Sequence, residues 1–509
     1  MKKWTIMVYL AGDNNLSEDM IWSLIGMRNA MKYQNSDDYI NLVAIYDSGY
    51  PTVPIQTYHF TNQNSSKELG ESVVETEQNG RRGNGNRSVS NNDTAYIIDF
   101  VTTHVKKFGA ENYALIMSGH SDNFLGKTMF YDSNPDSRIA LPYLSDILNT
   151  AKKAIGNNTK YVGGKPKFDL IGFDSCMMGM LEVGCELKDA AKYMVASQGY
   201  SPTDGWNYES ILSELIESNG KLTPEEFANS IVRNQITYSY NYNAGGRSMC
   251  LSCVDLEEIF SLRKSINKLG ETFNRILDET ILPKNDPAQE KNAVIRESIK
   301  NLIHDTHYFS QSFLHEQAVD VLDFVKNLSA GCDLKQKELE LVAGVTPVDN
   351  NGIAGTLKNN LNSIKSACGE VETTLNKYLK YKRLSGPEYQ FSEGVSIFFP
   401  WTLLAYNMVY HNYNELKFSK NSGWLKFIER YAKRTLRAKS QPRLGDPGSE
   451  SYGDWIFEVD SANKAETARA ETARAETAKA ETAKGDSDSF YKYFRRFRNH
   501  PVYHDIKKR

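Results

Sequence analysis

Short apolar runs alternate with amphipathic stretches along the first 200 residues of the chain. The apolar runs predict buried strands at 4–10, 39–46, 113–118, 168–173 and 193–198. Between them, apolar residues that recur at helical spacing predict helices at 17–31, 93–108, 141–154 and 177–187. Because strands that alternate with helices form parallel sheets covered on both faces, the pattern predicts an α/β fold with a mainly parallel central sheet.

The second half of the chain is richer in predicted helices. Helices are expected at 227–238, 256–269 and 424–431, and strands at 247–255 and 391–400. Residues 270–385 show helical periodicity with no strong strand, and residues 61–92 have the composition of an exposed loop. We therefore expect an α/β domain at 1–260, a mostly helical region at 261–390, a segment at 391–435 that returns to the core, and a tail at 436–509.

The tail contains two unusual segments. Residues 465–484 repeat Ala-Glu-Thr-Ala-Arg twice and Ala-Glu-Thr-Ala-Lys twice, which predicts a semi-rigid helical spacer with no apolar face. Residues 490–498 form an aromatic and basic cluster. Such a cluster is typical of a packed surface helix, of a surface that binds anionic membranes or nucleic acid, or of one that docks a partner protein.

Composition narrows the classes of function. A length of 509 residues predicts two or three domains. A net charge of −3 gives no field that attracts nucleic acid, so we expect no nucleic-acid partner. No apolar run approaches the roughly 20 residues of a membrane span, so we expect no transmembrane segment. The brief apolar start lacks a small-residue cleavage site, which favours a cytoplasmic location and leaves a secreted or periplasmic one open.

Two sets of residues have spacings that suggest metal ligands. Cys250 and Cys253 lack a second ligand pair, and the residues around them alternate as in a strand. His304 and His307 share a helical face without a carboxylate arrangement nearby. With only six cysteines, the chain is not a disulfide scaffold. We predict no metal site.

One reactive side chain follows each of two predicted strands. His120 comes after Ser118-Gly119, and Cys176 comes after Asp174-Ser175. If these strands are parallel neighbours, both side chains lie at the carboxyl edge of the sheet, where ligands and chemistry collect. An imidazole beside a thiol favours a thiolate nucleophile. Cys176 also begins a predicted helix, whose free N–H groups would favour a thiolate and stabilise an oxyanion.

The alternative for Cys176 is burial as a small apolar side chain, which is the more common role of a free cysteine. A lone histidine at a strand end is likewise more often a hydrogen-bonded polar residue. The equivalent positions of His120 and Cys176 after consecutive strands, together with their polar neighbours, favour the catalytic interpretation.

These segments resemble the clostripain-like cysteine peptidases, family C11, which are relatives of the caspases. The resemblance extends over about residues 1–430. It rests on residues 4–15 (Trp-Thr-Ile-Met-Val-Tyr-Leu-Ala-Gly-Asp-Asn-Asn), on Ser118-Gly119-His120 and on residues 174–179 (Asp-Ser-Cys-Met-Met-Gly), while 204–208 and 393–400 match in character. It implies a caspase-like α/β/α sandwich with a helical insertion and C-terminal region, in which 1–260 is the catalytic domain.

The resemblance also implies a cysteine endopeptidase with a Cys-His dyad. Cys176 would attack the scissile carbonyl and His120 would protonate the leaving amine. The family cleaves after Arg or Lys, and the matching acidic positions are Asp174 and Asp204. A carboxylate suits a cationic P1 side chain. Both aspartates also fit a structural role in turns. Where the family often has glycine after the histidine, this chain has Ser121.

Several relatives mature by cutting themselves between the histidine and the cysteine. In that interval Arg138 is the best candidate, and the repeat offers basic positions at Arg469, Arg474, Lys479 and Lys484. We expect no required cofactor. Ca²⁺ activation is left open, because Asp13, Asp47, Asp132 and Asp136 lack the spacing of an EF-hand loop.

The expected partners are protein or peptide substrates with Arg or Lys at P1, with a partner protein at the C-terminal tail as a further hypothesis. Two other functions stay open at this point. One is a binding or regulatory module on the same fold, and the other is a cysteine amidase that acts on small amides.

Overall fold

Residues 1–432 form one compact unit of the computed structural model, and 433–509 form a second. The structure describes residues 1–50, 53–76, 89–121, 130, 132–133, 136–137, 139–157, 165–239, 248–278, 288–313, 317–343, 352–401 and 403–435. Arg138, the repeat at 465–484 and the cluster at 490–498 lie outside the described residues.

A nine-stranded sheet organises the first unit, in the order β13-β10-β9-β8-β5-β1-β2-β3-β4. Its five central strands are mutually parallel: β1 (Lys2–Gly12), β2 (Ile40–Ser48), β5 (Ala110–Ser118), β8 (Phe168–Asp174) and β9 (Ala191–Ala196). Antiparallel strands extend both edges: β3 (Gln56–Phe60), β4 (Val73–Thr76), β10 (Met249–Asp255) and β13 (Leu379–Ser385). The five parallel strands are the five apolar runs, which confirms a mainly parallel central sheet.

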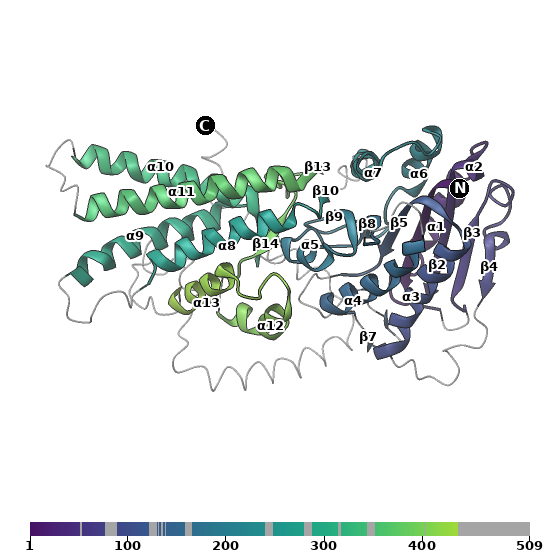
Figure 1. The fold of residues 1–509 in the computed structure, drawn as a ribbon, viewed down its shortest axis with the longest axis horizontal. Coiled ribbons are helices and arrows are strands. Elements are labelled where there is room, and N and C mark those ends of the chain that lie inside the picture. Colours follow the sequence, from purple (N-terminus) through teal and green to yellow (C-terminus); the bar gives the residue numbers. More distant parts are fainter. Residues whose placement is uncertain are drawn as a thin grey trace. The chain divides into compact units, whose positions relative to one another are not determined.

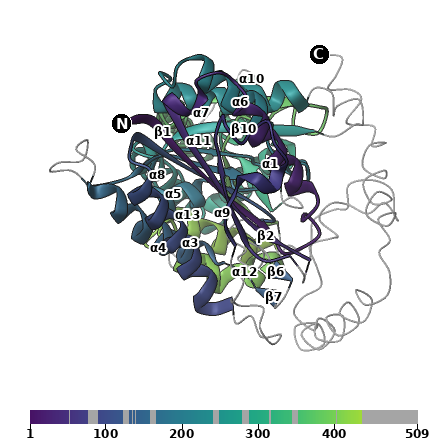
Figure 2. The same ribbon diagram turned by 90° about the vertical axis from the view of Figure 1, so that its right-hand side faces the viewer.

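Helices cover both faces of the sheet because its central strands are apolar on both sides. In β1, Met7 and Tyr9 belong to one buried cluster, whereas Ile6 and Val8 belong to the other. The second face packs against α1 (Asp19–Ala30), α6 (Tyr208–Glu217) and α7 (Pro224–Ser239). The first packs against α3 (Val89–Lys107), α4 (Leu141–Ala151) and α5 (Leu181–Leu187). Figure 2 shows the strands between these two helical layers, as expected of an α/β/α sandwich.

A group of long helices continues the molecule beyond the sheet (Figure 1). These helices are α8 (Ile259–Ile276), α9 (Ala288–Phe309), α10 (Val321–Ala343) and α11 (Ile353–Tyr378), and they pack against one another. Their apolar faces join the same core as α3 and α4. The shorter elements are α2 (Ser36–Tyr39), η1 (Leu69–Ser72), β6 (Asp132–Ser133), β7 (Asp136–Ser137) and η3 (Lys152–Asn157).

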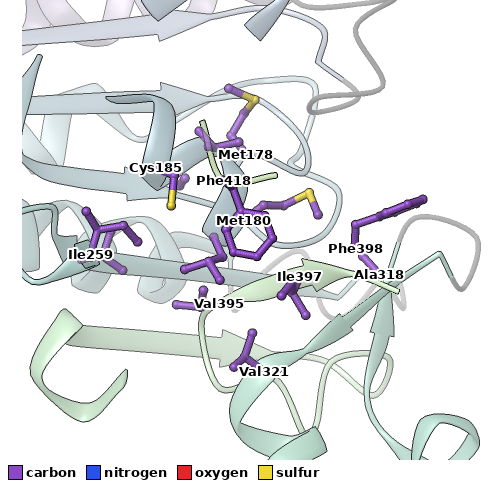
Figure 3. Close-up of a cluster of buried hydrophobic side chains, with 14 of the residues drawn as sticks. Met178, Met180, Cys185, Ile259, Ala318, Val321, Val395, Ile397, Phe398 and Phe418 are labelled. Carbon is purple, nitrogen blue, oxygen red and sulfur yellow. The ribbon is translucent and has the colours of Figure 1, made fainter. Parts of the chain in front are cut away.

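The C-terminal segment of the unit returns to the core beside the turn that carries Cys176. Its elements are β14 (Ser396–Phe398), α12 (Leu403–Glu415) and α13 (Gly423–Thr435), and β14 pairs with β12 (Ala318–Asp320), which pairs with β11 (Ser312–Phe313). Figure 3 shows Met178 and Met180, which follow Cys176, in one apolar cluster with Val395 and Ile397. The backbone agrees, because Ser396 N donates to Gly179 O at 3.0 Å.

Three predictions about elements were wrong. The helix expected from residue 177 begins at Leu181, because Met177 adopts a left-handed φ of 56° that no α-helix contains. The loop expected at 61–92 contains η1 and β4, and α3 begins before its end. The region 270–385 contains β13, whose half-buried and partly charged residues form an edge strand without an apolar run. The pattern also missed β3 and α6.

Candidate active site

Three adjacent parallel strands bring three loops together at one edge of the sheet. Leu10 of β1 pairs with Ser118 of β5, which in turn pairs with Asp174 of β8. The prediction that the strands before His120 and Cys176 are parallel neighbours is therefore confirmed. Their two loops also touch, because Ser121 Oγ donates a hydrogen bond to the carbonyl oxygen of Cys176.

His120 is half-buried just beyond the end of β5. Its Nε2 lies 2.7 Å from Oδ1 of Asn15, and its carbonyl oxygen accepts a hydrogen bond from Phe130 N at 2.7 Å. Burial lowers the pKa of the imidazole. Gly119 has a φ of 151°, and a Cβ there would lie 3.1 Å from the Cβ of Ala11. Glycine thus allows the chain to turn sharply before the imidazole.

The thiol of Cys176 is held by the loop that follows β9. Its Sγ accepts a hydrogen bond from Ser201 N at 3.3 Å. Burial raises the pKa of the thiol, while the Ser201 N–H lowers it and the Asp174 carboxylate raises it. In the described part of the chain, no hydrogen bond joins this thiol to the imidazole of His120. Burial thus favours the neutral form of each group, and each has a different hydrogen-bond partner.

Cys176 lies in a turn and not at a helix N-terminus, contrary to the sequence prediction. The helix α5 begins five residues later, at Leu181, so its dipole gives no account of a thiolate at Cys176. Two N–H groups of the turn instead donate to the segment after β9: Met177 N to Gly199 O at 2.9 Å, and Gly179 N to Ser197 O at 2.7 Å. The segment 197–201 thus fixes the conformation of the turn.

Asp174 is fully buried at the end of β8, among side chains of the α6 face. Its Oδ2 accepts hydrogen bonds from Trp206 N and Tyr208 OH, each at 3.1 Å, and Ser118 donates to the carboxyl group as well. Burial raises the pKa of Asp174 to about 6 against these hydrogen bonds, and the charge of Asp204 adds to the increase. Asp174 therefore has a structural role in holding the turn at 204–208, whatever else it does.

Asp204 is half-buried in the turn that faces Asp174. Gly205 N donates to Pro202 O at 3.3 Å, and Gly205 has a φ of 74°. A Cβ on Gly205 would lie 2.9 Å from Oδ2 of Asp174, so only glycine allows this close approach. The structure therefore brings the two predicted substrate-binding aspartates together, close enough for their charges to interact.

Sequence reasoning missed three residues that support this edge of the sheet. Asn15 is the last residue of the motif at 4–15, so its position was a usable signal. Ser201 and Tyr389 had none, because Ser201 bonds to Cys176 and Tyr389 packs on the segment 197–201 through tertiary contacts. The ring of Tyr389 covers Gly199, where a Cβ would lie 2.3 Å from its Cζ, and its hydroxyl accepts a hydrogen bond from Tyr200 N at 3.2 Å.

No group of three or more His, Cys, Asp or Glu side chains in the described ranges could hold a metal ion. Cys250 and Cys253 are buried within β10. The ring of His307 is stacked between Phe399 and Trp401, at 3.8 and 3.7 Å between ring centroids.

Among the helices that the structure describes, none has the length and apolar character needed to span a membrane.

A mainly parallel sheet between two layers of helices places the protein in the class of caspase-like α/β/α folds. The family model of the clostripain family, Peptidase_C11, matches residues 8–431. The chain belongs to the clostripain family, which is a family of cysteine peptidases. No curated protein matches the sequence.

Solved structures show the same fold at low identity. One is a secreted C11 cysteine protease from Bacteroides thetaiotaomicron in complex with an irreversible peptide inhibitor, with 17% identity, a TM-score of 0.51, and coverage of 85% of this chain and 98% of that one. Another is an inactive zymogen C11 protease from Parabacteroides distasonis, with 16% identity, a TM-score of 0.52, and coverage of 83% and 99%. The secreted protease iotapain from B. thetaiotaomicron has 14% identity, a TM-score of 0.52, and coverage of 82% and 98%.

Proposed function

We propose that the protein is a cysteine endopeptidase that cleaves peptide bonds after Arg or Lys, with Cys176 as nucleophile and His120 as general acid and base. One observation carries the proposal: in a chain of the clostripain family, Cys176 and His120 follow two paired parallel strands, and Ser121 bonds to the Cys176 carbonyl. Two reactive groups on one rigid sheet edge can act on the same bound peptide bond.

In the proposed reaction, His120 transfers the proton of the thiol to the leaving amine. The imidazole accepts the thiol proton as Sγ attacks the scissile carbonyl carbon, and it then donates that proton to the leaving amine as the C–N bond breaks. Water hydrolyses the resulting thioester, and the thiol is restored. The lowered pKa of His120 supports this role, because a neutral imidazole is ready to act as a base near neutral pH.

Two backbone N–H groups are suited to stabilise the oxyanion. Within the described residues, the N–H groups of Ser121 and Cys176 have no hydrogen-bond partner, whereas those of Met177 and Gly179 donate to the 197–199 segment. Unengaged donors near a developing charge contribute to catalysis because they need no reorganisation. The backbone N–H of a serine at position 121 can serve this purpose equally well as that of the glycine that is common there in the family.

The preference for Arg or Lys rests on Asp174 and Asp204. Two neighbouring acids, one with its pKa raised to about 6, repel each other when both are ionised. A guanidinium or ammonium group bound beside them would relieve this repulsion and favour the ionised form of Asp174. A neutral P1 side chain would not relieve this repulsion.

Several expectations remain predictions. Self-cleavage after Arg138 and a partner at the tail concern residues that the structure does not describe, and Ca²⁺ activation also stays open. Two of the matched structures are described as secreted proteases, so the expected cytoplasmic location gains no support from them.

A panel of fluorogenic peptides with Arg, Lys, Asp or Ala at P1 tests the proposal, with Cys176→Ala and His120→Ala as matched variants. We expect the Arg and Lys peptides to be hydrolysed far faster than the Asp and Ala peptides, and hydrolysis of all of them to be lost in both variants. Binding without hydrolysis by the unmodified protein would support a regulatory module instead. Release of ammonia from small amides, without peptide cleavage, would support an amidase.

A further inference from the structure

A third polar side chain reaches the candidate dyad from the loop after β1. Oδ1 of Asn15 lies 2.7 Å from Nε2 of His120. We propose that Asn15 is a positioning residue, which holds His120 in the tautomer that carries its proton on Nε2 and leaves Nδ1 to exchange protons during the reaction. This inference rests on the proposed function, and it adds a residue that the Cys-His dyad does not include.

The order of the strands places the three side chains in a row. β5 lies between β1 and β8, and all three strands are parallel. Asn15 follows β1, His120 follows β5 and Cys176 follows β8, each within a few residues of the strand end. The loop of His120 therefore lies between the loop of Asn15 and that of Cys176. One nitrogen of the imidazole bonds to Asn15, which leaves the other for the reaction.

The backbone around Asn15 is fixed although its side chain is exposed. Asn14 N donates to Gly12 O at 2.7 Å, Asn14 Nδ2 donates to Ala11 O at 2.9 Å, and Leu16 N donates to Asn14 Oδ1 at 2.9 Å. The same turn contacts the loop of His120, because Gly119 packs against Ala11. Asn15 is thus presented to His120 by a turn that is already ordered without substrate.

The chemistry follows from what a carboxamide oxygen can do. It only accepts hydrogen bonds, so the contact requires a proton on Nε2. In the neutral imidazole the lone pair is then on Nδ1, and in the imidazolium the same oxygen still accepts from Nε2. A fixed tautomer matters in catalysis, because an imidazole with its proton on the wrong nitrogen can neither accept the thiol proton nor return it.

Among the described residues, no charged group competes with Asn15 for this role. The lowered pKa of His120 arises from burial, and no charged side chain in the described part of the protein adds to it. With Asn15→Ala the ring would lose the only hydrogen-bond partner that its nitrogens have among the described residues. It would then be free to rotate and to populate both tautomers.

Nitrogen NMR of the full chain labelled with ¹⁵N-histidine tests the tautomer without any substrate. The signals of His120 are identified by their loss in His120→Gln. We expect the Nε2–H form in the wild type and a mixture in Asn15→Ala, with Asn301→Ala, which changes an exposed asparagine of α9, unaltered. An unchanged tautomer in Asn15→Ala would overturn the inference, even if the protein proves to have no peptidase activity.

Kinetics test the consequence. In Asn15→Ala we expect kcat to fall about tenfold to a hundredfold with KM nearly unchanged, because this is the range for hydrogen-bond partners that orient a metal-bound histidine, and Asn15 orients an imidazole in the same way. Asn15→Asp keeps an acceptor oxygen and adds a charge, so it should recover most of the activity and move the acidic limb of the pH–rate profile upward. A kcat within twofold of wild type in Asn15→Ala, or no rescue by Asp, would contradict a positioning role.

Discussion

Asp174 combines a structural and a proposed functional role in one carboxyl group. Its oxygen bonds to Trp206 and Tyr208, which hold the turn of Asp204 against the end of β8. A substitution that removes both the charge and the hydrogen bonds would therefore confuse recognition of substrate with loss of the turn. The amide of asparagine separates them, because its oxygen can still accept from Trp206 N and Tyr208 OH.

For Asp174→Asn we expect the KM for Arg and Lys peptides to rise tenfold or more, because a charge-assisted partner of the P1 cation is lost. Activity on the weaker Ala peptide should change little. Steady-state kinetics on the two substrate classes measure this, with Asp204→Asn as the companion variant. An equal loss on all substrates would mean that Asp174 acts only by holding the turn.

Glu182 is a buried carboxyl group that connects α5 to the C-terminal segment. Its Oε1 accepts hydrogen bonds from Phe398 N and Tyr413 OH, each at 3.0 Å, while its Oε2 has no partner among the described residues. Burial raises the pKa of Glu182 to about 7. The folded protein thus binds a proton here that the unfolded chain releases above its ordinary pKa, near 4.5.

This shift predicts that Glu182 contributes less to stability as the pH rises. Between about pH 4.5 and 7 the folded state binds more protons at Glu182 than the unfolded state does, so the contribution of this group to the free energy of unfolding falls across that window. Asp320, with its pKa raised by burial to about 7, acts in the same direction, whereas the pKa of His59, which burial lowers from 6.5 to about 4, acts in the opposite direction. Glu182→Gln resembles the protonated form, so its urea-unfolding free energy should fall less, or rise more, with pH than that of the wild type. Glu217→Gln, at an exposed position of α6, should retain the wild-type slope; an equal slope in Glu182→Gln would refute this prediction.

At the scale of elements, the sequence pattern predicted the strands that are buried on both faces of the sheet and missed strands at its edges. β1, β5 and β8 are continuous apolar runs, which is why the strands that carry the site could be identified. β13 lies at the edge of the sheet and alternates lysines with apolar residues, so its pattern is weak. The turn at Met177 has the sequence pattern of a helix because residues 177–187 are apolar enough for one, but its conformation depends on contacts with Ser197 and Gly199.

The site itself was predictable only in part, because local sequence patterns do not reveal contacts between distant segments. His120, Cys176 and the two aspartates follow strands or turns that local patterns reveal. The groups that orient them come from elsewhere in the chain: Ser201 from the loop after β9, and Tyr389 from the loop between β13 and β14. Contacts between segments so far apart leave no local pattern of spacing.

The loop between β13 and β14 supports the segment that holds Cys176. Besides the contacts of Tyr389, Gly394 N donates to Gln198 Oε1 at 2.9 Å, and Gln198 Nε2 donates to Asp320 Oδ2 at 2.8 Å. These contacts connect residues near 390 and 320 to the segment 197–201. The helical region and the C-terminal segment therefore contribute to the position of the thiol.

Substitution of Tyr389 tests this support. Tyr389→Ala removes a buried ring, so we expect a loss of about 3 kcal/mol in unfolding free energy and lower activity. Tyr389→Phe keeps the ring and removes only the acceptor for Tyr200 N, so it should cost about 1 kcal/mol. Phe391→Ala, at an exposed position in the same loop, is the control. Denaturant unfolding and the rate of Cys176 alkylation by iodoacetamide are the measurements; an alkylation rate unchanged in Tyr389→Ala would contradict the proposed support.

At the scale of the whole molecule, the proposed cut after Arg138 falls between two paired strands. β5 would end up in the N-terminal piece and β8 in the C-terminal piece, although the two strands are neighbours in the centre of the sheet. Their register from Ala114 to Ser118 buries apolar residues on both faces, so separation would expose the core. A cut there should leave the two pieces folded together.

Intact mass spectrometry of the purified protein tests self-processing. We expect active wild type to be cut after Arg138, Cys176→Ala to remain whole, and Arg138→Gln to lose that cut. The two pieces should elute together in native gel filtration and separate only in denaturant, because the β5–β8 pairing and the shared core hold them. The same spectra would reveal cuts in the repeat after Arg469, Arg474, Lys479 or Lys484. Fully active protein of intact mass would rule out maturation by self-cleavage, and a cut in purified Cys176→Ala would point to another protease.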